Sequence, residues 1–283
     1  MASTRPLVGI DIGGTGIKAA IVTPLGKVLG RARRDTLPEE GVERVLSRIE
    51  EAVVEACWKS GVDRSKLRAV GVGAPGAVDR SRGVVLSAVN LGWKDLRLAD
   101  LLKKQLGLMV TIENDVDAAI WGEKLVGAGK GETEQLGVWV GTGIGGGLVL
   151  NNKLYTGRHN TAGEVGRGVV LPWAPPGQGS VEQVCSRTGM VETLTRLLRS
   201  GRSSSIAPGG KFDPEQIDNR ALAKGLKSGD PLVVEVVEHA AMVLGTSIGG
   251  IITLLSLGRV VLGGGVTDAL GRQWLEAVRR AAR

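Results

Sequence analysis

The apolar residues in the first part of the chain follow two different periods. Residues 7–22 contain two apolar runs rich in β-branched side chains and joined by a glycine turn, which predicts a β-hairpin. Residues 42–61 place apolar side chains three and four positions apart and end in glycine, as an amphipathic helix does. Strand patterns follow at residues 67–79 and 110–115. Such alternation of strands and helices is typical of an α/β protein.

The same pattern begins again near the middle of the chain. Residues 136–155 read as an apolar strand, a glycine turn and a second apolar strand, which indicates an internal duplication of one structural unit. We therefore expect two related lobes that face each other across a cleft. The small N-terminal α/β lobe would comprise residues 1–115, and the larger C-terminal α/β lobe residues 116–283.

Three further segments stand out in the C-terminal lobe. Residues 231–256 form a long, largely apolar helical pattern, and residues 259–266 form a short apolar strand that ends in three glycines. Residues 197–216 are rich in Ser, Gly and Pro and have no periodicity, so we interpret them as a mobile loop or lid.

The composition is that of an ordinary soluble protein. The 283 residues are 42% apolar and 23% charged, which excludes disordered and fibrous classes and suits two packed lobes. The net charge of +7 suits a polyanionic small substrate, and no nucleic-acid-binding motif accompanies it. Neither a leader nor a membrane-length apolar run is recognised, so we expect a cytoplasmic protein without membrane or nucleic-acid partners. Cys57 and Cys185 lack paired spacing, which favours reduced core thiols.

Three glycine-rich turns, at residues 13–16, 141–147 and 263–265, each follow an apolar strand directly. Without Cβ atoms, such turns let backbone N–H groups approach a phosphate closely. Tight hairpins made for topology alone are the alternative, which weakens when three turns share the pattern. Neither a P-loop nor a dinucleotide-binding fingerprint fits. The candidate phosphate-binding residues are Gly13, Gly14, Thr15, Gly141, Thr142, Gly143, Gly263, Gly264 and Gly265.

Three carboxylates crowd the stretch "TIENDVDAAIWGE", where Glu113, Asp115 and Asp117 alternate after an apolar strand. The stretch from Asp115 onward predicts a helix, and the dipole and free N–H groups of a helix start favour acids in its first turn. Taken alone, the stretch leaves two interpretations of Asp115 open: a capping acid or a functional carboxylate.

Five motifs in this order resemble the ROK family of bacterial sugar kinases and repressors: "GIDIGGTGIKAAIV", "GVGAPGAVD", "ENDVDAAIWGE", "VGTGIGGGLVLNNKLYTGRHNTAGEVG" and "VVLGGGV". The resemblance covers most of the chain. It implies a duplicated, two-lobed ribonuclease H-like fold of the actin, hexokinase and heat-shock ATPase type. It further implies an ATP- and Mg²⁺-dependent hexose kinase, glucokinase above all, acting on the 6-hydroxyl. The repressor branch carries a winged helix before the first strand, whereas six residues precede Leu7 here, so a repressor is not expected.

The resemblance also implies roles for single residues. Asp115 takes the place of the catalytic base, and Asp11 that of the acid that holds Mg²⁺ through water. Thr15 and Thr142 would face the phosphates, and Asp117 would be a capping or supporting acid. The sugar contacts would be Gly76, Asn90, Asn114, Glu164 and Glu182.

The chain departs from the family where a structural zinc is bound. Arg167, Trp173, Pro175 and Ser180 stand at the four ligand positions. Trp and Pro offer no ligand atoms and Arg stays protonated, so we predict that zinc is absent. We expect the proline-rich loop, with Trp173 packed in it, to brace this region instead.

The same departures leave alternatives open. They resemble polyphosphate-using relatives, so the phosphate donor is either ATP, which we favour, or polyphosphate. An N-acyl hexosamine kinase and a non-catalytic sugar-binding protein are further alternatives. Relatives are commonly homodimers or homotetramers, and they continue after the last glycine motif with a strand and a helix, whereas 17 residues follow Val266 here.

Overall fold

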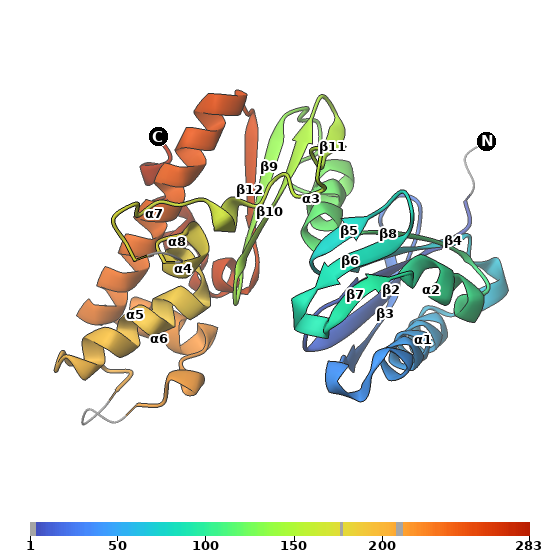
Figure 1. Ribbon diagram of the computed structural model, residues 1–283, viewed down its shortest axis with the longest axis horizontal. Coiled ribbons are helices and arrows are strands. Elements are labelled where there is room, and N and C mark those ends of the chain that lie inside the picture. Colours follow the sequence, from blue (N-terminus) through green and yellow to red (C-terminus); the bar gives the residue numbers. More distant parts are fainter. Residues whose placement is uncertain (1–3, 176–177, 208–211) are drawn as a thin grey trace. The chain divides into compact units, whose positions relative to one another are not determined.

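The structure is a computed structural model that describes residues 4–175, 178–207 and 212–283 (Figure 1). Its contacts divide the chain into two compact units. The first unit comprises Met1–Lys130 and Gly157–Thr161, and the second comprises Gly131–Thr156 and Ala162–Arg283.

The division between the two units lies after Lys130, whereas the sequence pattern places it after residue 115. Helix α3 (Asp115–Val126) accounts for the difference. It packs against strands β4 (Ala69–Ala74) and β8 (Met109–Asn114) and so belongs with the first unit. A helix that follows a buried strand covers the sheet of that strand, and this contact is not visible in the linear pattern.

A sheet with the strand order β3-β2-β1-β4-β8 forms the centre of the first unit. Strand β2 is antiparallel to both β1 and β3, while β4 and β8 continue in parallel from β1. The remaining elements of this unit are β1 (Leu7–Ile12), β2 (Gly16–Val22), β3 (Val28–Asp35), a small sheet of β5 (Ala77–Asp79), β6 (Val84–Ala88) and β7 (Trp93–Leu96), helices α1 (Val42–Ser60) and α2 (Leu98–Leu106), and 3₁₀ turns η1 (Pro38–Glu40), η2 (Arg64–Lys66) and η3 (Val89–Leu91).

The predicted hairpin at residues 7–22 and the helix at 42–61 are confirmed. Strands β1 and β2 pair directly, and α1 covers β2 and β3. The helix ends at Gly61, whose φ of 67° is left-handed and costs glycine little. The hydrophobic spacing of α1 therefore reports a real buried face, which includes Val45, Ile49 and Val53.

Near the ends of β1, β4 and β8, one face of the first sheet carries buried apolar side chains and the other carries polar ones. Ile10, Val72 and Ile112 lie in register on β1, β4 and β8, and all three are buried. The following row, from Asp11 to Glu113, points to the opposite face because side chains alternate along a strand. Polar groups thus gather where these parallel strands end.

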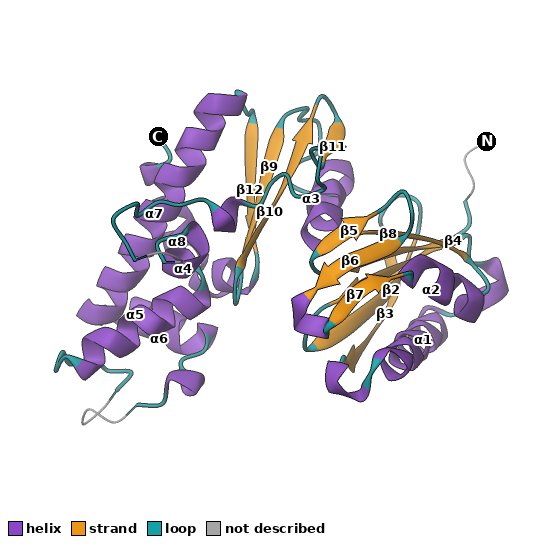
Figure 2. Cartoon of the chain, viewed as in Figure 1, coloured by secondary structure: helices purple, strands orange, loops and turns teal. Residues whose placement is uncertain are grey.

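The second unit carries a sheet with the order β11-β10-β9-β12, with its helices packed beside it (Figure 2). Helices α7 and α8 contact each other, and α8 contacts β9 and β12. The elements are β9 (Gln135–Val140), β10 (Ile144–Leu150), β11 (Lys153–Tyr155), β12 (Arg259–Gly263), η4 (Val165–Arg167), α4 (Val181–Cys185), α5 (Arg187–Arg199), η6 (Pro214–Gln216), α6 (Asn219–Ser228), α7 (Pro231–Leu255) and α8 (Gly265–Ala281).

The internal duplication is confirmed by the strand pairing. An antiparallel hairpin, a third antiparallel strand and a parallel fourth strand occur as β1–β2, β3 and β4, and again as β9–β10, β11 and β12. The hairpin loops differ in length, because Ile12 pairs with Ile17 but Val140 pairs with Ile144. The two glycine turns are therefore related but not identical.

Helix α7 is long and apolar enough to cross a membrane by length and composition alone. Its buried residues, which include Leu232, Val236 and Leu244, belong to the hydrophobic core of the second unit. A Cβ on Gly245 would overlap the carbonyl oxygen of Val278 in α8, so glycine here permits the close approach of two helices. These contacts are those of a core helix.

The two cysteines are buried in separate cores, as the sequence predicted for core thiols. Burial raises the pKa of the Cys57 thiol. Deeper burial raises the pKa of Cys185 to about 12, so both thiols are protonated at neutral pH.

Candidate active site

Asn114 connects two loops of the first unit at the end of β8. Its Oδ1 accepts hydrogen bonds from the backbone N–H groups of Val116 (2.9 Å) and Asp117 (3.1 Å), so Asn114 caps α3. Its Nδ2 donates to the carbonyl oxygen of Gly76 at 3.0 Å. Asn114 is therefore the N-cap residue of α3, and Asp115 and Asp117 lie in the first turn of this helix.

Asp115 is the first residue of α3 and is partly buried. Its Oδ1 accepts from the N–H of Val116 at 2.9 Å, which orients the carboxylate at the helix N-terminus. Gly73 makes room for this backbone, since a Cβ there would lie 3.3 Å from the Cα of Asp115. Asp117 is buried in the same helical turn.

Gly76 needs to be glycine for two reasons. Its φ of 84° is left-handed, and a Cβ would overlap the carbonyl oxygen of Ser87. This close approach brings the Gly76 loop against the end of β6, directly before Asn90 in η3. Asn90 in turn lies beside the first glycine turn, where a Cβ on Gly14 would be 3.4 Å from the Cβ of Asn90.

The carbonyl groups of Gly13, Thr15 and Gly16 in the first glycine turn accept hydrogen bonds. The N–H of Gly13 donates to the carbonyl of Gly16 at 2.9 Å, and the buried Thr36 donates through its hydroxyl to the carbonyl of Gly13 at 2.6 Å. The carbonyl of Thr15 accepts from the N–H of Thr36 at 3.3 Å. Within the described parts of the chain, no hydrogen bond engages the N–H groups of Gly14 and Thr15.

Asp11 lies one residue before the end of β1, and its side chain is 51% exposed. Its carboxylate accepts from the ammonium group of Lys18 at 3.0 Å, across the antiparallel pair that the two residues form. A single accessible carboxylate fits Mg²⁺, which keeps several waters and needs few protein ligands. Glu113, on the same face, pairs instead with Arg80 at 3.2 Å.

Glu182 lies in the second unit, where it supports the second glycine turn. Its Oε2 accepts from the N–H of Ile144 at 2.7 Å, and a Cβ on Gly143 would overlap this carboxylate. Glu164 precedes η4, which packs on β10 close to this turn. Its carboxylate is 3.8 Å from Arg167, and both side chains are exposed.

The start of α5 holds the tip of the second turn. The N–H of Arg187 donates to the carbonyl of Gly141 at 2.9 Å, and the hydroxyl of Thr188 donates to the carbonyl of Thr142 at 2.8 Å. The guanidinium of Arg187 donates to Thr142 Oγ1 at 2.9 Å. No local pattern in the sequence pointed to Arg187, Thr188 and Thr36, because each lies far along the chain from the turn that it contacts.

The third glycine turn joins strand β12 to helix α8, whereas the first two turns each join two strands. Gly264, with a φ of 92°, forms the N-cap of α8 without a side-chain cap. A Cβ on Gly264 would overlap the carbonyl of Val140, at the end of β9. The second and third turns therefore lie at the same edge of the second sheet, where uncapped N–H groups of a helix favour an anion.

The loop at the family's zinc position is closed by backbone pairing. Val169 bridges with Ser180, and the N–H of Val181 donates to the carbonyl of Gly168 at 2.9 Å. Ser180 also caps α4 in a capping box with Gln183. The prediction that Trp173 packs into this loop is wrong, since that residue is 80% exposed.

The absence of a structural zinc stays a prediction. No group of three or more His, Cys, Asp or Glu side chains that could hold a metal ion occurs among the described residues. Pro175 borders residues 176–177, which lie outside the described residues.

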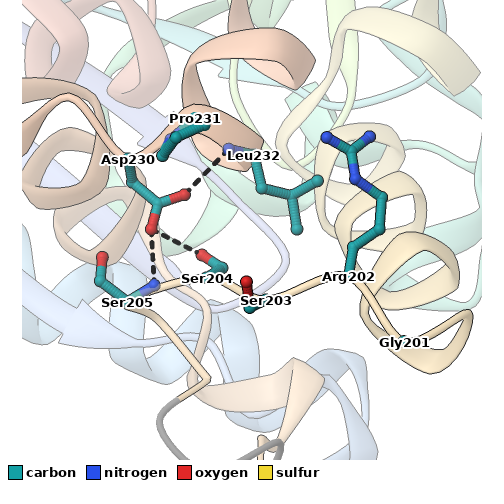
Figure 3. A pocket seen from close by; sticks show the side chains of 8 residues that line it. All are labelled: Gly201, Arg202, Ser203, Ser204, Ser205, Asp230, Pro231 and Leu232. Carbon is teal, nitrogen blue, oxygen red and sulfur yellow. Dashed lines mark hydrogen bonds between the residues drawn. The ribbon is translucent and has the colours of Figure 1, made fainter.

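An open depression of about 530 Å³ lies between residues 201–205 and the start of α7 (Figure 3). Asp230 caps α7 and also accepts from Ser204 Oγ (2.9 Å) and from the N–H of Ser205 (2.5 Å). Burial alone would raise the pKa of Asp230, but these hydrogen bonds outweigh it and lower the pKa to about 2. The carboxylate already fills the place of an anion at this helix end, and none of the predicted site residues lines the depression.

The same bonds bear on the loop predicted at residues 197–216. Its described part before residue 208 is tied to α7 by Asp230 and by an ion pair of Arg202 with Glu235 at 2.7 Å. Residues 208–211 lie outside the described residues. The described part is thus anchored to the second unit.

The predicted site residues therefore form two groups, one in each unit. Gly76, Asn90, Asn114 and Asp115 gather beside the first glycine turn in the first unit. Glu182 and the second and third turns gather at one sheet edge in the second unit.

The chain is similar in sequence and in structure to proteins of one family. The sequence model of the ROK family matches residues 7–282. The glucokinase of Thermotoga maritima is 35% identical over 271 residues, which cover 93% of this chain and 83% of that protein. A ROK family glucokinase from Streptomyces griseus, solved in complex with glucose and AMPPNP, has 32% identity and a TM-score of 0.84, covering 98% of this chain and 88% of that one. A ROK hexokinase from Thermus thermophilus has 31% identity and a TM-score of 0.78 over 98% and 88%.

These solved structures confirm the expected fold class, the duplicated two-lobed α/β fold of the actin and hexokinase type. The family model and the structural match both cover nearly the whole chain. The chain therefore belongs to the ROK family.

Proposed function

We propose that this protein is a sugar kinase that transfers the terminal phosphoryl group of ATP to the 6-hydroxyl of a hexose, with glucose as the first candidate. The relatives that support this are named glucokinases, and one of them was solved with glucose and AMPPNP. Asp115 is the general base in this proposal.

One observation carries the proposal: the bridge from Asn114 to Gly76 holds Asp115 next to the Gly76 loop. That loop contacts the end of β6 just before Asn90, and Asn90 lies beside the first glycine turn. An attacking sugar hydroxyl needs a fixed acid beside groups that bind its neighbouring hydroxyls, since catalysis of phosphoryl transfer rests on positioning and charge stabilisation.

The remaining hydrogen-bond capacity of Asn114 suits a sugar. Its Oδ1 already accepts two backbone N–H groups, and one N–H of the amide is used on Gly76. The second N–H remains and can donate to a sugar hydroxyl oxygen. Asp115, which accepts but does not donate when ionised, then takes the hydrogen bond and finally the proton of the adjacent 6-hydroxyl.

The candidate groups for binding the phosphate donor are the glycine turns, of which one lies in the first unit and two lie in the second. The N–H groups at 14–15 and at the start of α8 point to anion binding, and the Thr15 and Thr142 hydroxyls add polar contacts. Bound Mg²⁺ would neutralise charge on the phosphates, and Asp11 is the residue that we assign to it through water. In that role Asp11 would give up its contact with Lys18.

The experiment is an assay of the full chain with ATP, Mg²⁺ and a panel of hexoses and N-acyl hexosamines, with ADP release and the phosphorylated carbon both measured. Release of ADP with a sugar 6-phosphate product is expected. Binding of glucose by calorimetry without ADP formation would instead identify a non-catalytic sugar-binding protein. A parallel reaction with polyphosphate in place of ATP decides the donor.

We also propose a homodimer or homotetramer, in line with the resemblance. Light scattering of the purified chain at two concentrations gives its mass directly, and a monomer at both would refute this assembly.

A further inference from the structure

In the second glycine turn, the carbonyl groups of residues 141–143 all accept hydrogen bonds. The carbonyl of Gly143 accepts from the N–H of Gly141 at 2.9 Å, while the carbonyls of Gly141 and Thr142 accept from Arg187 and Thr188. Among the described residues, no hydrogen bond engages the N–H groups of Thr142 and Gly143. A carbonyl oxygen would repel a phosphate, so this arrangement leaves the tip suited to an anion.

Arg187 adds a cation to this tip. One N–H of its guanidinium is used on Thr142 Oγ1 at 2.9 Å, and no carboxylate of the described chain lies within ion-pair distance of it. A guanidinium has five N–H donors in a planar fork. A purely structural link to one hydroxyl would use a single donor and would not need a permanent charge.

A nearby negative charge gives the cation a physical purpose. The carboxylate of Glu182 lies directly beside Gly143, held by the N–H of Ile144. An anionic ligand at the turn would meet this like charge at short range, which disfavours binding. The guanidinium of Arg187, which contacts Thr142 of the same turn, offsets this negative charge.

We propose that Arg187 is a donor-binding residue, whose guanidinium contacts the outer phosphates of a nucleoside triphosphate held at the turn of residues 141–143. The inference rests on the proposed function, because it takes the second turn as the donor site. The class of ligand follows from the chemistry, because the planar fork of guanidinium donors pairs with phosphate oxygens. A nucleoside monophosphate lacks the outer phosphates that Arg187 would contact.

The test compares Arg187→Met, Arg187→Lys and the wild type. In Arg187→Met the KM for ATP should rise about 10- to 100-fold, the range of a lost charge-assisted hydrogen bond, while the KM for the sugar stays unchanged. Calorimetry should show the same loss for ATP binding but none for AMP. Arg187→Lys restores the charge without the fork and should fall between the two.

Two controls separate this role from structural and long-range effects. Arg196→Met removes the same charge from the exposed side of α5 and should leave the KM for ATP unchanged. Thr188→Val breaks a hydrogen bond to the same turn without removing charge. The melting temperatures of Thr188→Val and Arg187→Met show how much each hydrogen bond to the turn contributes to stability.

The outcomes are distinct. If the wild type phosphorylates sugar and Arg187→Met keeps its affinity for ATP, or loses AMP and ATP affinity equally, the inference is wrong and the proposed function survives. If Arg187→Met is misfolded, an unchanged KM for ATP in Arg187→Lys and Arg187→Gln refutes it in the same way. If the wild type binds no nucleotide, the proposed function fails, and the inference fails with it.

Discussion

The side-chain amide of Asn114 donates a hydrogen bond to the carbonyl oxygen of Gly76 at 3.0 Å, and the same amide caps helix α3. One side chain thus ties the end of β8 to the loop after β4. Asp115, the next residue, inherits a fixed position from both contacts. The catalytic proposal depends on this rigidity, because a base that is displaced by 1 Å loses much of its effect.

Replacing Asp115 by Asn keeps the size of the side chain but removes the proton acceptor. We expect kcat to fall about 10²- to 10⁴-fold, with the affinity for the sugar little changed. Steady-state kinetics and sugar calorimetry check both parts. Asp100→Asn, at an exposed ion pair with Arg97, serves as the control and should remain active. Substantial turnover by Asp115→Asn would mean that another group is the base.

Gly76→Ala should destabilise the first unit and disturb the sugar site. The left-handed φ costs about 1–3 kcal/mol for a non-glycine residue, and the overlap with the carbonyl of Ser87 adds to it. We expect a lower Tm and a raised KM for the sugar. Gly71→Ala, in the neighbouring strand β4 where a Cβ meets open space, is the matched control. Equal melting temperatures for the two variants would contradict the role of Gly76.

Ser180→Ala should weaken the loop that stands at the family's zinc position. Loss of an N-cap hydroxyl costs about 1 kcal/mol, and here it also breaks the capping box with Gln183. Trp173→Ala should leave the stability nearly unchanged, because this side chain is exposed. Urea denaturation of both variants measures the difference, and a larger loss in Trp173→Ala would restore the tryptophan as the brace.

Asp230 should make stability depend on pH in the acid range. Its pKa in the folded protein is about 2, below the ordinary value of 3.8, so the ionised form is the one that stabilises the fold. The contribution, of the order of 2 kcal/mol, is complete above pH 5 and is lost as the pH falls through 4 towards 2.

The variant Asp230→Asn isolates this effect. It should be less stable than the wild type at pH 7 by about 2 kcal/mol, and the difference should shrink as the pH is lowered. Denaturation curves at pH 7, 5 and 3 for both proteins give the comparison, with Asp100→Asn as a surface control. A difference that does not change with pH would mean that hydrogen-bond geometry, and not charge, matters at this position.

Much of this molecule can be derived from local patterns. The apolar spacing of residues 42–61 and the closing Gly61 predicted α1 almost to the residue, because one helix face is buried and glycine alone favours the left-handed cap. The repeated strand–turn–strand pattern predicted the two related sheets for the same kind of reason: alternation along a strand reports which face is buried. Motif order then identified Asp115 and the glycine turns as candidates.

Other features needed the folded chain. The residues around Thr142 do not predict its contacts with Arg187 and Thr188, and those around Gly13 do not predict its contact with Thr36. These contacts join segments that are distant in sequence. The exposure of Trp173 is similar, because an aromatic residue among prolines is equally compatible with a packed or a solvated position until its neighbours are known.

The amino-acid sequence by itself determined the elements, their duplication and the identities of the candidate groups, since these depend on residue type and on spacing within one segment. Only the tertiary structure decided which of those groups meet. Asn114 became a cap and a bridge, and Glu182 became the support of a turn. The physical reason is that hydrogen bonds and charge pairs act over a few ångströms of space, whatever the distance along the chain.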